Sequence, residues 1–216
     1  MTTDTDVLPT MSSAAPLPRP RTRPAQLGLD TAYVLLGSPV AVAAFVVVIT
    51  GLAVSAGTLV VWVGVPLLTV TLMAARGLAT VERAQLPAVL GHPVPSPAYR
   101  RAGPEAGPVT RLMTPWRDPQ SWLDALHAVV RFPVAIFSFV VTVTFWSVAL
   151  AGLTYWAWDW ALPHSPDDYE LPELLGFADT AITRIAFYAV VGIVAAGLLP
   201  FVVRGVALVQ AQLGRV

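Results

Sequence analysis

Three long stretches without a charged side chain limit what this chain can fold into. They are residues 31–75, 132–158 and 185–203. A charge at the centre of a lipid bilayer is costly, and a helix needs roughly 20 apolar residues to cross the hydrocarbon. The first stretch is long enough for two crossings, and each of the others for one. The sequence therefore predicts an all-α, polytopic protein of the cell membrane with four transmembrane helices.

Composition supports this class and excludes several others. Of the 216 residues, 56% are hydrophobic and only 12% are charged, whereas soluble domains carry about 25% charged residues. The formal net charge is zero, so the charge balance does not suggest a nucleic-acid partner. There is no cysteine, which excludes disulfides, thiolate metal sites and cysteine nucleophiles.

The four spans can be placed approximately. We expect one membrane domain over residues 30–205, with helices at about residues 32–54, 58–75, 125–155 and 181–204. The turn between the first two is the small-residue segment GLAVSAGT. Residues 1–29 are rich in proline and are expected to form a disordered cytoplasmic tail, and residues 206–216 a short cytoplasmic C-terminus.

Arginine is distributed unevenly between the connecting segments. The loop over residues 76–124 carries six arginines, whereas the loop over residues 156–180 has none and is acidic. Because cytoplasmic loops carry an excess of basic residues, the first loop is expected inside and the acidic loop outside. Both termini are then cytoplasmic.

Two of the apolar stretches are nearly the same sequence. SPVAVAAFVVVIT begins at Ser38 and FPVAIFSFVVTVT begins at Phe132, and pairs such as Asp30 and Asp124 match at the same spacing. Apolar helices can look alike because few residues suit lipid, but matched Asp, Pro and Trp favour a duplication. The copies are separated by two crossings, so we expect a parallel 2+2 internal repeat.

The cytoplasmic loop contains a helix-start signal. Asp118 followed by Pro119 is typical of an N-cap with proline at the first helical position. The third long helix is therefore expected to begin in the cytoplasm, before its apolar stretch.

The outer loop contains the best candidates for contact with a signal. Clustered carboxylates can bind a cation, and aromatic rings can face a cationic ligand. An equally simple interpretation is a solvated loop whose acids reflect the orientation bias. The candidate signal-sensing residues are Trp158, Asp159, Trp160, His164, Asp167, Asp168, Glu170 and Glu173.

No catalytic or cofactor signature is present in the sequence. The three histidines, His92, His127 and His164, lie in different segments and form no HExxH pair. There is also no acid or base in the middle of a span, which argues against an ion-coupled transporter. We expect a protein that is not an enzyme and has no cofactor or metal.

Several segments together resemble a known family. They are YVLLGSPVAVAAFVVVITGL, VGVPLLTVTLMAARGLATVERAQLPAVLG, PVPSPAYR, WRDPQSWLDALHAVVRFPVA, WALP and LLPFVVRG, in this order. The chain resembles the "putative sensor" membrane domain found at the N-terminus of actinobacterial sensor histidine kinases. The resemblance implies a four-helix membrane domain that detects a signal in a two-component system.

The kinase portion of that family is not expected in this chain. Only twelve residues follow Arg204, and none is a histidine. We therefore expect either a stand-alone sensor or a truncated one, signalling to a histidine kinase or another regulator in trans. The alternatives are a small oligomeric channel or transporter subunit, and a scaffold that recruits partners through the Pro-rich cytoplasmic loop.

Overall fold

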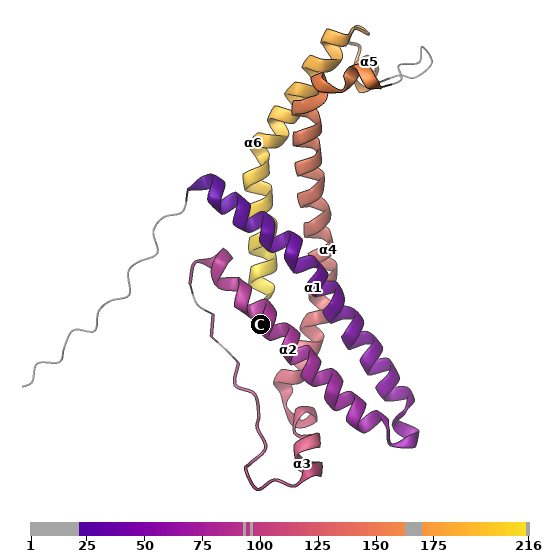
Figure 1. Cartoon of the computed structure of the whole chain (residues 1–216), viewed down its shortest axis with the longest axis vertical. Helices are drawn as coiled ribbons and strands as arrows, with labels where there is room; N and C mark the ends of the chain where they lie inside the picture. The colour runs from indigo at the N-terminus through magenta and orange to yellow at the C-terminus, as the bar shows by residue number, and fades with distance from the viewer. Residues whose placement is uncertain (1–21, 93, 96, 163–169, 215–216) are drawn as a thin grey trace, which may run out of the picture.

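The fold consists of four long helices joined by short helices and irregular segments (Figure 1). The computed structural model describes residues 22–92, 94–95, 97–162 and 170–214, and these residues contain no strand. The long helices are α1 (Arg23–Gly57), α2 (Gly64–Leu90), α4 (Pro119–Thr154) and α6 (Ala181–Leu213). The short ones are η1 (Leu59–Val61), α3 (Pro108–Met113), η2 (Pro115–Arg117), η3 (Tyr155–Ala157), η4 (Asp159–Ala161) and α5 (Leu171–Leu174).

All four long helices are long and apolar enough to cross a membrane. Their positions agree with the spans expected from the uncharged stretches, so the all-α membrane class is confirmed. Each helix is longer than its expected span, because polar residues beyond the apolar part continue the helical pattern. Residues 23–29, which we assigned to the tail, form the first turns of α1.

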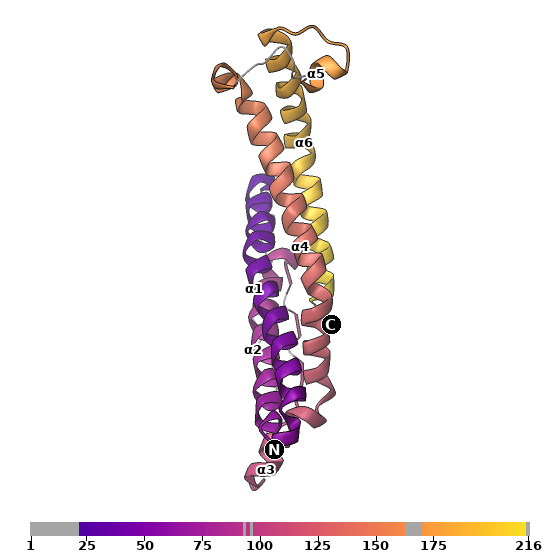
Figure 2. The same cartoon turned by 90° about the vertical axis from the view of Figure 1, so that its right-hand side faces the viewer.

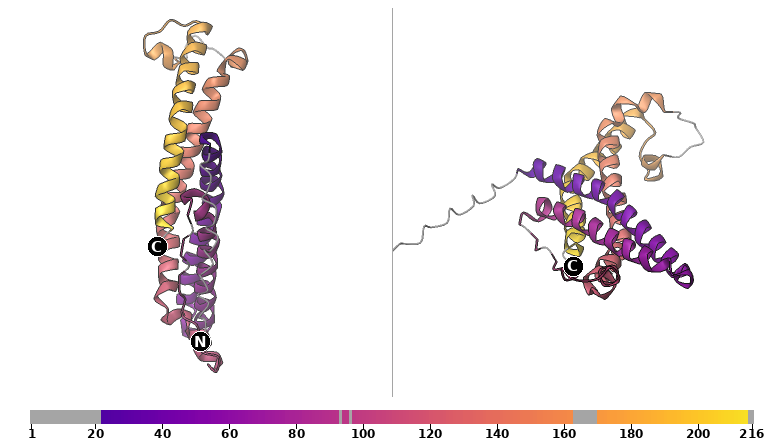
Figure 3. Two further views of the ribbon diagram at one scale, coloured as in Figure 1. Left: turned by 90° about the vertical axis from the view of Figure 1, so that its left-hand side faces the viewer. Right: turned by 60° about the horizontal axis from the view of Figure 1, so that its bottom comes forward.

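The helices form two hairpins that cross each other. The turn between α1 and α2 and the loop between α4 and α6 lie at opposite ends of the molecule (Figure 2). The views in Figure 3 show the first hairpin crossing the second, with α6 lying along α4.

Helices α1 and α4 run in opposite directions where they pack. The indole N–H of Trp146 donates to Thr31 Oγ1 at 3.2 Å, and the rings of Phe45 and Phe132 stack at 4.2 Å. Early α1 thus meets late α4, and later α1 meets early α4. This differs from the parallel orientation that we inferred from the repeat.

The connection between the hairpins explains this orientation. Residues of the connection return along α2, where the Thr69 hydroxyl donates to the Leu112 carbonyl at 2.9 Å. Helix α4 therefore begins beside the first half of α2 and runs in the same direction as α2.

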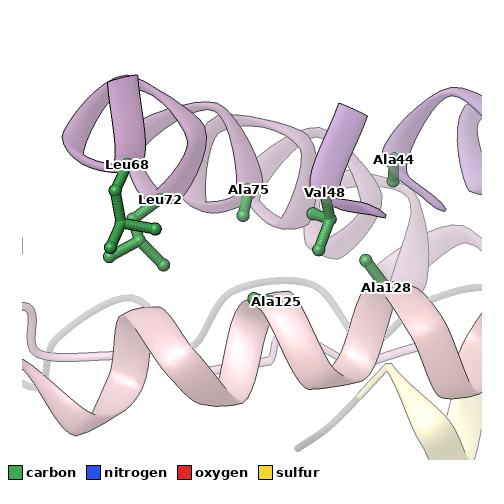
Figure 4. Packing of buried hydrophobic residues seen from close by; sticks show 7 residues of the cluster. All are labelled: Ala44, Val48, Leu68, Leu72, Ala75, Ala125 and Ala128. Atoms are coloured by element: carbon green, nitrogen blue, oxygen red, sulfur yellow. The ribbon is translucent and has the colours of Figure 1, made fainter. Parts of the chain in front are cut away.

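Small residues make the contact close (Figure 4): the cluster consists of Ala44, Val48, Leu68, Leu72, Ala75, Ala125 and Ala128.

Glycine brings the helices of the second hairpin into backbone contact. A Cβ added at Gly152 would lie 2.5 Å from the Tyr188 carbonyl oxygen and 2.7 Å from Gly192 Cα. Only glycine fits at such a crossing. Helices α4 and α6 are consequently fixed against each other near the acidic loop.

Candidate functional site

The acidic loop is organised around one arginine at the start of α6. Arg184 donates to Asp159 Oδ1 at 3.3 Å and to Asp179 Oδ1 at 2.7 Å, and its Nε lies 3.9 Å from Glu170 Oε1. Asp159, one of the candidate sensing residues, is buried. One arginine compensates only part of the charge of these three carboxylates, so the cluster keeps a net negative charge.

The other predicted loop residues have different environments. Trp158 and Trp160 are exposed, and Glu173 lies in the short helix α5. The predicted residues His164, Asp167 and Asp168 lie outside the described residues. Among the described residues, no group of three potential ligands forms a metal site.

Aromatic rings connect this loop to the hairpin below it. The Tyr155 ring packs at 5.0 Å from Trp158 and at 4.3 Å from Tyr188 on α6. A displacement of the loop would therefore act directly on both helices.

A second polar site lies where all four long helices meet. We call it the four-helix junction and define it as Tyr33, Glu82, His127, Arg131 and Gln210. The Glu82 carboxylate of α2 lies 3.0 Å from His127 Nε2 and forms an ion pair with Arg131 Nη1, both on α4. Arg131 is only 2% exposed. A buried pair of this kind is held by its partners, since each charge alone would be costly to bury.

The junction also contains polar atoms without a hydrogen bond. Within the described residues, these atoms are Nε and Nη2 of Arg131, the Tyr33 hydroxyl and both amide atoms of Gln210. Gly37 leaves room for them, because a Cβ there would lie 3.3 Å from Arg131 Nη2. Each unpaired buried group costs about 1–3 kcal/mol. Buried polar groups of this kind need an explanation, which makes the junction a candidate site.

A further set of ion pairs fixes the connection beside the junction. Arg83 pairs with Asp124 at 2.6 Å, and the Tyr99 hydroxyl donates to the same carboxylate at 2.8 Å. Arg76 pairs with Asp118 at 2.7 Å and lies over the Tyr99 ring, 4.8 Å from its centroid. Burial, followed by the hydrogen bond to Asp124, raises the pKa of Tyr99 above its ordinary value. Tyr99 therefore remains a donor to Asp124 at neutral pH.

Asp118 stands at the N-cap position that the sequence predicted, but its side chain does not make the hydrogen bond that a capping residue makes. Pro119 occupies the first helical position of α4. The Asp118 carboxylate accepts from Arg76 and Ser121 instead.

The sequence did not point to the junction, because charged residues were considered as functional candidates only in the middle of a predicted span. Glu82 and Arg131 lie just outside the uncharged stretches. The available signal was spacing: Asp124, His127 and Arg131 recur at helical intervals, as do residues on one face of a helix. Glu82 and Arg83 provide the opposite charges on α2.

Comparison with known proteins supports the resemblance found in the sequence. Residues 33–216 match the family described as "Putative sensor". The chain belongs to this family. The matched range includes the acidic loop and every residue of the four-helix junction. No curated protein and no solved structure matches the chain.

Proposed function

We propose that this protein is a non-enzymatic sensing module of the cell membrane that detects a signal outside the cell or within the bilayer and passes it to a cytoplasmic partner. Family membership and four membrane-length helices support the sensor-type membrane domain. What we add as a proposal is that the signal passes inward and that a cytoplasmic partner receives it.

One observation carries the proposal: α4 and α6 connect the acidic loop to the four-helix junction. At one end, Asp159 just beyond α4 pairs with Arg184 of α6. At the other, Arg131 of α4 lies near Gln210 of α6, since both approach the Cβ position of Gly37. The Gly152–Gly192 crossing holds the two helices together between these ends.

The junction has the features of an element with two arrangements. Glu82 is shared by His127 and Arg131, and the unpaired donors of Arg131 offer alternative bonds. A small movement of α4 relative to α2 would exchange partners without exposing the charges. A signal has to favour one arrangement by its differential affinity for the two.

The proposed orientation follows from the arginines. The connection between α2 and α4 carries Arg100, Arg101, Arg111 and Arg117, and basic segments remain on the cytoplasmic side. It packs on α2 beside Arg76 and Arg83. A change in the α2–α4 pairing would therefore alter the surface that faces a partner. We propose that this partner is a histidine kinase or another regulator acting in trans.

Purification from native membranes in mild detergent, followed by mass spectrometry, tests the proposal. We expect a signalling protein in stoichiometric amount with the wild-type chain, and an altered amount with the loop variant Asp159→Asn/Arg184→Gln. The matched control is Gly77→Ala, which changes a position on α2 with open space around it and outside the loop.

Two other results would contradict sensing in trans. A homo-oligomer without a partner would favour a channel or transporter subunit, to be examined by flux in liposomes. A partner that binds independently of the loop variant but is lost on deletion of residues 97–108 would favour a scaffold.

A further inference from the structure

A groove lies between the N-terminus of α1 and the second half of α6. Its volume is about 810 Å³, within the range of small-molecule sites. Its lining includes Gly197, Pro200 and Phe201 of α6 and the charged residues Arg23, Asp30 and Arg204. It is separate from the acidic loop and from the five residues of the four-helix junction.

The groove changes from apolar to cationic along α6. Residues 196–201 lie within the uncharged stretch 185–203, and Arg204 ends that stretch. Phe201 is 74% exposed, and no atom lies within 4 Å of a Cβ added at Gly197. The wall from Gly197 to Phe201 is thus open and apolar, and the charge begins at its end with Arg204.

The charges at the mouth of the groove leave a positive excess. Arg204 Nη1 donates to Asp30 Oδ1 and to the Val89 carbonyl, both at 3.0 Å. Asp30 is buried and also accepts from Gln26 at 2.8 Å. The Arg204 side chain nevertheless remains 36% exposed, and the exposed Arg23 adds a second guanidinium. The partly positive N-terminal end of α1 lies at the same place.

We propose that this groove binds one anionic phospholipid. Its phosphate is held by Arg204 and Arg23, and an acyl chain lies against the wall formed by Gly197 and Phe201. Charge complementarity selects an anionic headgroup, since Asp30 is already neutralised by Arg204. The apolar wall selects a lipid over a free phosphate, because a soluble anion gains nothing from it. The proposal does not depend on the sensing role.

Native mass spectrometry of the full chain tests the site. The protein is extracted from vesicles of phosphatidylglycerol and phosphatidylcholine in equal amounts, and the retained lipid is identified. We expect one phosphatidylglycerol to be retained preferentially. Gly197→Leu fills the groove without changing charge and should abolish this preference. Gly77→Leu is the matched control, because Gly77 also has open space around its Cβ position and lies outside the groove.

Charge variants test the headgroup contact. Arg23→Gln should weaken retention about fivefold, since a basic residue near anionic headgroups contributes about 1 kcal/mol. Arg204→Gln is combined with Asp30→Asn, so that no buried carboxylate is left unpaired, and should have a larger effect. Arg101→Gln, in the connection, is the control. Deletion of residues 1–21 should leave retention unchanged.

Three results would overturn the proposal. They are equal retention of the two lipids, retention unaffected by Gly197→Leu, and displacement of the lipid by millimolar inorganic phosphate alone. Binding that disappears on deletion of residues 1–21 would likewise assign it to the N-terminal segment and not to the groove.

Discussion

The two hairpins are built alike near their tips but differ in how their charges are placed. In the first hairpin, a Cβ at Gly51 would overlap the side chain of Thr71, and in the second, Gly152 meets Gly192. Both therefore use glycine for close helix packing. The first, however, carries ion-pairing residues along α2, whereas α6 carries its arginines at Arg184 and Arg204.

This difference indicates distinct roles. Helix α2 is fixed to the beginning of α4 by three ion pairs, those of Arg76, Glu82 and Arg83. The α4/α6 hairpin is apolar between its ends and ends in a loop organised around Arg184. Between its ends, α6 is joined to α4 by packing and not by ion pairs, so α6 can shift against α4, and the charged residues at its ends report the shift.

The largest effect is expected from separating the buried pair at the junction. Arg131→Met leaves the Glu82 carboxylate buried with only His127, and should lower the free energy of unfolding by about 3–5 kcal/mol. Chemical unfolding in detergent measures this. The double variant Glu82→Gln/Arg131→Met should lose less than the sum of the single variants, and strict additivity would show that the pair is not coupled.

The glycine crossing of the second hairpin should be nearly as sensitive. Gly192→Ala places a methyl group against the Gly152 backbone and should cost about 1–3 kcal/mol. The control Gly77→Ala has open space and should be neutral or stabilising by up to about 1 kcal/mol. Equal effects of the two substitutions on thermal unfolding would mean that the crossing is not in backbone contact.

A smaller effect is expected at the connection beside α2. Tyr99→Phe removes the hydrogen bond to Asp124 and should cost about 1 kcal/mol. Because the pKa of Tyr99 is raised on folding, its contribution is fully present below the ordinary tyrosine pKa and is lost as pH rises through the folded value. The difference between wild type and Tyr99→Phe should therefore disappear at strongly alkaline pH. A difference that grows with pH would contradict this assignment.

The smallest effect is expected in the acidic loop. Asp179 pairs with Arg184 but its side chain is 66% exposed. Asp179→Asn should change stability by less than about 1 kcal/mol, and high salt should remove the effect. A large loss measured in the same unfolding assay would indicate that the loop contributes more to the fold than its exposure implies.

The number and approximate position of the helices were predictable because lipid imposes a strong constraint on charge. The start of α4 was predictable from Asp118 and Pro119. The first turns of α1 were not, since residues 23–29 were assigned to the tail. The partners that Arg76 and Glu82 find at the start of α4 were not predictable either. The repeat in the sequence could not predict the relative direction of the two hairpins, because similar apolar helices can pack in either direction.

The candidate sites show the same limit. The acids of the outer loop were found from composition, but not the pairing of Asp159 with Arg184, which lie 25 residues apart on either side of α5. The junction depends on single residues from all four helices. No local pattern connects Tyr33 with Gln210, and only their packing brings them together.

The central claim is that the acidic loop and the four-helix junction are coupled through α4 and α6. The chain contains no cysteine, so nitroxide labels can be attached only at introduced sites. Val81 on α2 and Val209 on α6 are exposed neighbours of the junction. The measurement is the distance distribution between labels at Val81→Cys and Val209→Cys in liposomes, by pulsed electron paramagnetic resonance. The account predicts a shifted distribution when Asp159→Asn/Arg184→Gln disrupts the loop, whereas an unchanged distribution, with the protein still folded, would contradict the coupling.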